Sequence, residues 1–172
     1  MGFQSLYIVR HGDRYDYSYP EWKERANRPG DPPLSDLGHA QARETGEYLN
    51  TLLAEDNISA EDVTVLSSPF LRCIQTTNNV LAKFKMEDAH QLRIKPEDSV
   101  WEIDSGRNAH SDLPTVVERG CYFPRLDVEH ESLFVPDVPG KQKMALKILH
   151  LSLHCSSYDT VCLSLNINEP EF

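Results

Sequence analysis

The residues best suited to chemistry in this sequence are Arg10, His11 and Gly12, which directly follow the short apolar run Leu6–Val9. A neutral imidazole can attack phosphorus and carry the phosphoryl group covalently. A neighbouring guanidinium can bind phosphate oxygens through two parallel hydrogen bonds, and Gly12 lets the backbone turn and leaves room for the anion. The tripeptide predicts phosphoryl chemistry at His11, with the alternative that Arg10 and His11 are ordinary loop residues.

A second candidate segment, Ser67–Thr76, places Arg72 in the first turn of an expected helix. Ser68 is the expected N-cap and Pro69 suits the first helical position. The N-terminus of a helix attracts anions through its free N–H groups and its dipole, and an arginine there adds charge and two donors. Taken alone, Arg72 is better interpreted as a solvated arginine on a helix surface.

The elements around these segments alternate between strand and helix. The expected strands are Leu6–Val9, Val63–Leu66, Leu92–Lys95 and Thr160–Leu165. Three helices are expected: one that begins after Ser35, one that begins after Ser68, and one over Lys141–His154. This alternation predicts an α/β fold, a three-layer, mainly parallel sheet with helices on both faces. Ligands of such sheets bind at the carboxyl ends of the strands, where Arg10 and Ser67 stand.

The first long helix is expected to begin at Asp36, with Ser35 as its N-cap, and to end near Asn57. Its core face is expected to consist of the residues that recur at helical spacing, namely Thr45, Tyr48, Leu49, Leu52 and Leu53. The segment 12–33 is expected to be a long loop, and residues 104–140 are expected to be irregular.

Taken together and in this order, these segments resemble the histidine phosphatase (phosphoglycerate mutase-like) superfamily. Leu34–Ala42 matches its Leu-Ser/Thr-x-x-Gly-x-x-Gln-Ala pattern, and Ser67–Thr76 matches its Ser-Ser-Pro-x-x-Arg-x-x-Gln-Thr pattern. The branch that the chain resembles most is the phosphatase domain of the ubiquitin-associated and SH3-domain-containing proteins. Residues 1–172 are interpreted as a single domain, well matched over 1–105, divergent over 141–172 and incomplete at the C-terminus.

The resemblance implies roles for particular residues. His11 would be the phosphorylated nucleophile, and Glu102 the acid that protonates the leaving oxygen and later deprotonates water. Arg10 and Arg72 would bind the phosphate, and Arg14 would be a further phosphate ligand. The alternatives are a surface carboxylate for Glu102 and a non-catalytic arginine at position 14. Phosphoryl transfer of this kind works by positioning and charge stabilisation, so no metal and no other cofactor is expected.

The C-terminal part departs from the family pattern. The family has a second histidine after a late strand, and Asn166 stands where the resemblance expects it. His154 is a candidate replacement, with a core or surface histidine as the alternative. Losing one donor of the phosphate pocket would lower the rate by about 10²–10³, which predicts reduced activity.

The expected function is a phosphatase that hydrolyses phosphate monoesters through a phosphohistidine intermediate. The alternative is a catalytically impaired relative that binds phosphorylated ligands or partners without turnover. A mutase is disfavoured because Asp13-Arg14-Tyr15 replaces the Glu-Ser of the mutases. Tyr15, Tyr17, Tyr19 and Trp22 could line a site for an aromatic leaving group such as phosphotyrosine, or could pack on the surface.

The bulk properties limit the partners. The 172 residues carry a formal net charge of −10, which argues against nucleic acid and anionic membranes. The resemblance implies a phosphorylated small molecule or a phosphoprotein as the partner. The N-terminus lacks the pattern of a signal peptide, no apolar run is long enough to span a membrane, and the four cysteines form no CxxC pair. These features predict a cytoplasmic protein, and they leave its substrate and oligomeric state open.

Overall fold

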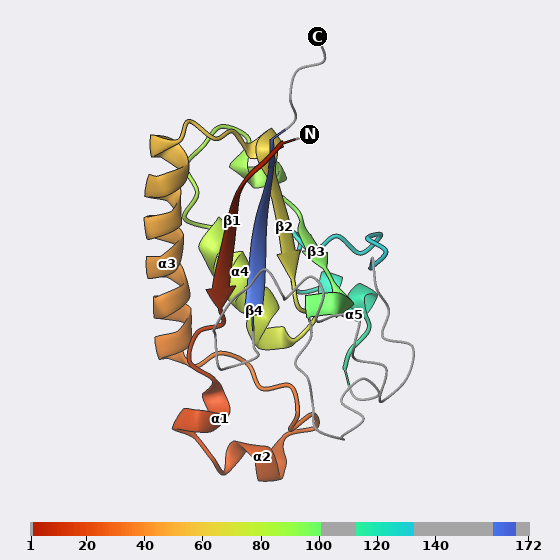
Figure 1. The fold of residues 1–172 in the computed structure, drawn as a ribbon. Helices are drawn as coiled ribbons and strands as arrows, with labels where there is room; N and C mark the ends of the chain where they lie inside the picture. Colours follow the sequence, from red (N-terminus) through yellow and green to blue (C-terminus); the bar gives the residue numbers. More distant parts are fainter. Residues whose placement is uncertain (1, 101–112, 133–159, 168–172) are drawn as a thin grey trace.

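The computed structural model describes residues 2–100, 113–132 and 160–167 (Figure 1). Its four strands form one sheet in the order β1-β4-β2-β3. They are β1 (Gly2–Arg10), β2 (Val63–Ser67), β3 (Ile94–Pro96) and β4 (Thr160–Ile167). The helices are α1 (Tyr15–Ser18), α2 (Trp22–Arg25), α3 (Asp36–Glu55), α4 (Leu71–Leu81) and α5 (Val116–Gly120), with short 3₁₀ turns η1 (Ala60–Asp62), η2 (Ala89–Gln91) and η3 (Asp98–Val100).

The sheet is mainly parallel in direction, as expected. β2 and β3 pair in parallel, whereas β4 pairs antiparallel with both β1 and β2. β1, β2 and β3 therefore share one direction, and β4 runs against them. Arg10 pairs with Thr160 and Ser67 with Val161, so the carboxyl ends of β1 and β2 flank the first residues of β4.

The direction of β4 overturns one expectation. Asn166 lies opposite Phe3, near the start of β1, and is therefore at the far end of the sheet from His11. The prediction that Asn166 occupies the position of the family's second histidine is wrong for this structure. The expectation assumed that this strand runs parallel to β1, with its last residues beside His11. Because β4 is antiparallel to β1, its first residue, Thr160, lies beside Arg10 at the carboxyl end of β1. His154 and the expected helix Lys141–His154 lie outside the described residues.

Helix α3 begins and ends where the sequence predicts. The Ser35 side chain accepts a hydrogen bond from the backbone N–H of Gly38, so it caps the helix. Leu49 and Leu53 are buried as expected, but Tyr48 is 65% exposed, and its expected place in the core is wrong. The helix instead packs on α4 through Gly46, where an added Cβ would lie 2.6 Å from the carbonyl oxygen of Val80. Because Gly46 faces α4, Tyr48, two residues further along the helix, lies on the opposite side and faces away from the core.

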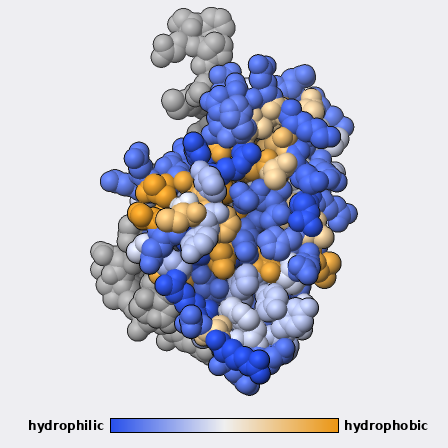
Figure 2. All heavy atoms as spheres, turned by 180° about the vertical axis from the view of Figure 1, so that it is seen from behind, coloured by the Kyte–Doolittle hydropathy of each residue, from blue (hydrophilic) through white to orange (hydrophobic). Residues whose placement is uncertain are grey.

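The core lies between the sheet and the pair of helices α3 and α4, which Figure 1 shows together on one side of the strands. It is built from buried aliphatic and aromatic side chains of several elements: Leu49, Leu53, Val63, Val65, Ile74, Val80, Leu81, Phe84, Leu92, Ile94 and Leu126. Burying each of the larger ones contributes about 1.5–3 kcal/mol. Seen from behind, the described surface is mostly hydrophilic, with small groups of hydrophobic side chains among polar ones (Figure 2).

Strand β1 buries one face. Tyr7 and Val9 pack against the core, whereas Leu6 and Ile8 remain 40% and 43% exposed. Within the described residues, the predicted strand Leu6–Val9 is therefore confirmed as a strand, but its burial alternates along the chain. Such alternation is the signature of a strand with one face on the core.

Two segments expected to be irregular contain short helices. The segment between β1 and α3 forms α1 and α2, and the segment after η3 includes α5. Helix α5 begins with a capping box in which Thr115 and Glu118 bond to each other's backbone N–H, a signal that is visible in the sequence as Thr-x-x-Glu. None of the helices in the described ranges is both long and apolar enough to cross a bilayer.

Candidate functional site

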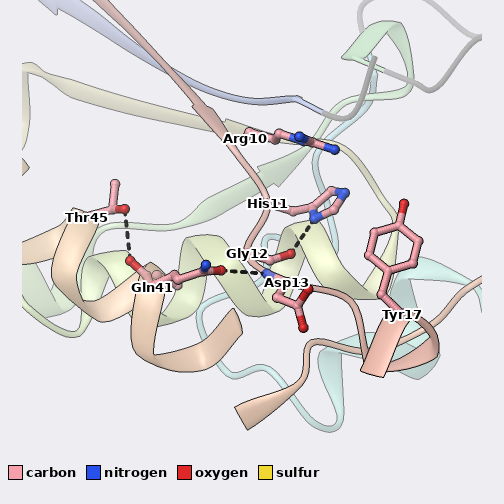
Figure 3. A pocket seen from close by; sticks show the side chains of 8 residues that line it. Arg10, His11, Gly12, Asp13, Tyr17, Gln41 and Thr45 are labelled. Atoms are coloured by element: carbon pink, nitrogen blue, oxygen red, sulfur yellow. Dashed lines mark hydrogen bonds between the residues drawn. The ribbon is translucent and has the colours of Figure 1, made fainter. Parts of the chain in front are cut away.

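A cavity of about 390 Å³ opens at the carboxyl end of β1 (Figure 3). It is lined by residues of the β1 end, of α1 and of α3, namely Arg10, His11, Gly12, Asp13, Tyr17, Gln41, Ala42 and Thr45. Two of the predicted site residues, Arg10 and His11, are thus brought into one cavity. Within the described residues, no cluster of histidine, cysteine and carboxylate side chains is suited to hold a metal ion.

The imidazole of His11 is held in a defined orientation. The side chain is 6% exposed, and its Nδ1 lies 2.6 Å from the carbonyl oxygen of Gly12. A carbonyl oxygen can only accept, so this contact assigns the proton of the neutral ring to Nδ1. The lone pair of the neutral ring then lies on Nε2, so Nε2 is the ring atom that can act as a nucleophile.

The loop that carries His11 lies directly on the first turn of α3. A Cβ added to Gly12 would lie 2.8 Å from the carbonyl carbon of Gly38 and closer still to its oxygen, and one added to Gly38 would lie 2.8 Å from the backbone N of Asp13. The sequence suggested that Gly12 leaves room for an anion. The space at Gly12 is in fact required by the backbone of Gly38.

Replacing Gly12 with alanine is therefore expected to destabilise the fold by about 1–3 kcal/mol, because backbone rather than a flexible side chain occupies the space. Urea unfolding of the two proteins measures the difference. Gly30→Ala is a matched control, since nothing lies within 4 Å of a Cβ at that position. Equal unfolding midpoints for the Gly12 and Gly30 variants would contradict the close approach seen here.

Asp13 ties this loop to α3 and α1. Its backbone N–H donates to Gln41 Oε1 at 2.8 Å, and its carbonyl oxygen accepts from the backbone N–H of Ser35 at 2.9 Å. Its Oδ2 accepts from the hydroxyls of Ser35 at 2.6 Å and of Ser18 at 3.2 Å. Two residues of the recognised Leu34–Ala42 pattern, Ser35 and Gln41, thus hold the loop that carries the nucleophile.

Arg72 lies in the first turn of α4, as predicted, and is 1% exposed. Its guanidinium carbon lies 4.1 Å from the centre of the Phe70 ring. The hydroxyl of Thr76 donates to the carbonyl oxygen of Arg72 at 2.8 Å and accepts from the N–H of Gly12 at 3.2 Å. Thr76 thereby joins the loop after β1 to the turn that carries Arg72, although Arg72 is not among the residues that line the cavity.

The N-terminus of α4 is capped by a distant residue. Ser68 was the expected cap, but the helix begins at Leu71 after Phe70, which makes no side-chain cap hydrogen bond. Instead, Asp31 Oδ1 accepts from the backbone N–H of Leu71 at 2.8 Å, and Asp31 Oδ2 is paired with Arg119. Because a carboxylate already occupies Leu71 N–H, this end of the helix dipole is compensated from within the protein.

Arg14 is engaged by a carboxylate of its own segment. Its Nε and Nη2 donate to the two oxygens of Asp16, both at 2.9 Å, and Lys23 Nζ lies 2.9 Å from Asp16 Oδ2. The Asp16 side chain is 0% exposed. The expected role of Arg14 as a phosphate ligand stays a prediction, and its observed partner is Asp16.

The pKa of Asp16 makes a testable contribution to acid stability. Burial raises this pKa, but the hydrogen bonds and charges of Arg14 and Lys23 outweigh burial and hold it below its ordinary value of 3.8. A depressed pKa stabilises the fold above the unfolded-state pKa, and the stabilisation is lost as the pH falls through the folded-state pKa.

The unfolding free energy of the wild type is expected to exceed that of Asp16→Asn by a constant amount above about pH 5. The gap should shrink as the pH falls below 3.8, the ordinary value. Urea unfolding at a series of pH values measures the gap. A gap that stays constant or widens in acid would contradict the depressed pKa.

Glu102, the expected acid, lies outside the described residues. Nearby in sequence, Glu97 is 1% exposed at the end of β3, and its backbone N–H donates to the carbonyl oxygen of Ser67 at 2.8 Å. Its carboxylate accepts from the Ser132 hydroxyl and lies 3.5 Å from His130 Nε2. The sequence did not single out Glu97, whose backbone joins the carboxyl end of β3 to that of β2 and whose carboxylate bonds Ser132.

Several curated proteins are similar to part of this chain. The chain is 30% identical over 125 residues to the ubiquitin-associated and SH3 domain-containing protein A of Mus musculus, covering 57% of this chain and 19% of that protein. It is 33% identical over 104 residues to the sedoheptulose 1,7-bisphosphatase of Saccharomyces cerevisiae, covering 58% of this chain and 35% of that enzyme. The chain thus matches about a fifth to a third of these relatives' length, and the resemblance to the SH3-domain-containing proteins is confirmed.

A solved structure shares the fold. The ecdysone phosphate phosphatase from Bombix mori, in complex with tungstate, superposes with a TM-score of 0.63 at 20% identity, covering 84% of this chain and 63% of that one. This likeness confirms the expected α/β fold class. The family model described as "Histidine phosphatase superfamily (branch 1)" matches residues 6–126, more than half of the sequence. This chain therefore belongs to the histidine phosphatase superfamily.

Proposed function

We propose that this chain hydrolyses phosphate monoesters through a covalent phosphohistidine at His11. The observation that carries the proposal is the 2.6 Å contact between His11 Nδ1 and the carbonyl oxygen of Gly12. The contact places the proton of the neutral ring on Nδ1 and the lone pair on Nε2, in a cavity that Arg10 also lines. Family membership supports the proposal, as do the names of two relatives, the yeast sedoheptulose 1,7-bisphosphatase and the Drosophila melanogaster ecdysteroid-phosphate phosphatase.

The reaction has two steps. In the first, the Nε2 lone pair of His11 forms an N–P bond while the P–O bond of the ester breaks, and the leaving oxygen takes a proton from an acid. In the second, a water oxygen attacks phosphorus, the P–N bond breaks, and the conjugate base of that acid takes the water proton. Glu102 is the proposed acid, and Arg10 and Arg72 are the proposed phosphate ligands, because arginine binds phosphate oxygens in a bidentate manner.

The proposed substrates are phosphorylated small molecules or phosphoproteins. An arginine in the cavity and a buried arginine on α4 supply positive charge that the chain as a whole, at a net charge of −10, lacks. A local positive site within an acidic surface favours anionic ligands over nucleic acid, which needs an extended basic face.

The experiment combines turnover with capture of the intermediate. Hydrolysis of p-nitrophenyl phosphate is followed across pH, and a radiolabelled ester is mixed with the protein and quenched in base, in which phosphohistidine survives. We expect turnover, and label on the peptide that contains His11. Folded protein that neither turns over nor takes up label would overturn the proposal, and calorimetry with inorganic phosphate would then test the alternative of binding without turnover.

A further inference from the structure

A chain of contacts runs from a buried carboxylate to the wall of the His11 cavity. The Asp16 side chain, which is 0% exposed, accepts hydrogen bonds from Nε and Nη2 of Arg14 and also forms an ion pair with Lys23. The guanidinium carbon of Arg14 lies 4.5 Å from the centre of the Tyr17 ring. Tyr17 in turn lines the cavity beside the imidazole of His11 (Figure 3).

The contacts restrict a side chain that would otherwise move. Tyr17 is 55% exposed, and an exposed ring on a four-residue helix loses rotamer freedom only when a neighbour holds it. Arg14 is such a neighbour because its planar fork is itself fixed by two parallel bonds to one carboxylate. The ring is therefore supported by Arg14, and Tyr17 also lines the cavity.

We propose that Asp16 is a positioning residue of this site: it fixes Arg14, and Arg14 fixes the Tyr17 ring as the wall that meets the leaving group of the substrate. The inference rests on the proposed phosphatase function. A leaving group with a flat apolar surface would contact this wall, whereas the phosphoryl group, which lies at His11, would not. Asp16 touches neither and acts through Arg14 alone.

The test compares an aryl ester with a small alkyl ester. Tyr17→Ala is expected to raise KM for phenyl phosphate about 3- to 10-fold, the scale of one aromatic contact. It should leave kcat within about 2-fold, and should leave KM for ethyl phosphate unchanged, because the contact is made to the leaving group alike in ground and transition states. Tyr48→Ala is the matched control, since Tyr48 is 65% exposed on α3 and does not line the cavity. Equal KM changes for the two esters would overturn the inference.

A double-mutant cycle isolates the relay. Asp16→Asn alone is expected to raise KM for phenyl phosphate, and to have no further effect once Tyr17 is alanine, because residues that act through one another are not additive. A purely structural role of Asp16 predicts the opposite, namely an equal effect in both backgrounds, and an additive result would overturn the proposal.

Binding measurements separate this inference from the proposed function. Calorimetry with phenyl phosphate and with inorganic phosphate needs no turnover. We expect Tyr17→Ala to weaken binding of phenyl phosphate and to spare inorganic phosphate, and Asp16→Asn to weaken binding of phenyl phosphate more than binding of inorganic phosphate. If this pattern is found in a protein that shows no turnover, the inference stands and the proposed phosphatase activity is excluded. Equal weakening of both ligands would overturn the inference.

A second variant covers the case in which Asp16→Asn does not fold. Arg14→Lys keeps the positive charge but loses the fork that grips both oxygens of Asp16. Because Arg14 is also a predicted phosphate ligand, this variant is expected to weaken binding of phenyl phosphate more than binding of inorganic phosphate. Equal weakening of both ligands would overturn the assignment of Arg14 as the support of Tyr17.

Discussion

Replacing His11 with alanine is expected to lower kcat for p-nitrophenyl phosphate by about 10⁴-fold or more, the scale of losing a covalent nucleophile. The reason is geometric: the imidazole is 6% exposed, and its Nδ1 faces the carbonyl oxygen of Gly12, so Nε2 carries the lone pair of the neutral ring. Alanine offers no lone pair, and no covalent intermediate can form. Steady-state kinetics, together with the loss of the radiolabelled intermediate, measure the effect.

The control for this variant is His90→Ala. His90 lies in η2, is exposed and is remote in sequence from the cavity, so its replacement should leave kcat unchanged. Both variants should unfold at the wild-type urea concentration if the effect is chemical. Residual turnover in His11→Ala within tenfold of the wild type would exclude His11 as the nucleophile.

Replacing Arg72 with methionine is expected to lower kcat/KM by about 10²–10³, the scale of removing one preorganised donor to the reacting phosphoryl group. Methionine suits the position because it fills irregular buried space without charge, and Arg72 is 1% exposed against the ring of Phe70. The expected loss is therefore of charge and of the bidentate donors. Kinetics with p-nitrophenyl phosphate and calorimetry with inorganic phosphate should both register it.

Arg72→Lys refines this prediction. A lysine keeps the charge as a compact ammonium but cannot supply two parallel donors, so its activity should fall between those of the wild type and the methionine variant. Arg43→Met is the matched control, because Arg43 is an exposed arginine of α3 with a single 3.3 Å hydrogen bond to Asn79. An Arg72→Met protein that folds and retains wild-type kcat/KM would remove Arg72 from the phosphate pocket.

The sequence by itself determined the local structure that frames the site. Strand β2 and the start of α3 stand where the β-branched run and the cap at Ser35 predict them, and Arg72 occupies the first turn of α4. These features depend on neighbours a few residues away, so hydrophobic periodicity and capping chemistry are enough to find them. The order of the motifs was likewise enough to indicate the family.

The tertiary structure alone decided how these pieces meet. Asp31 caps α4 from 40 residues away, and Arg119 reaches the same carboxylate across 88 residues. The backbone of Gly12 lies so close to that of Gly38 that no Cβ fits between them. The direction of β4 places Asn166 opposite Phe3, at the other end of β1 from His11. Each of these contacts joins segments distant in sequence, and their pairing depends on the packed fold, which no local pattern encodes.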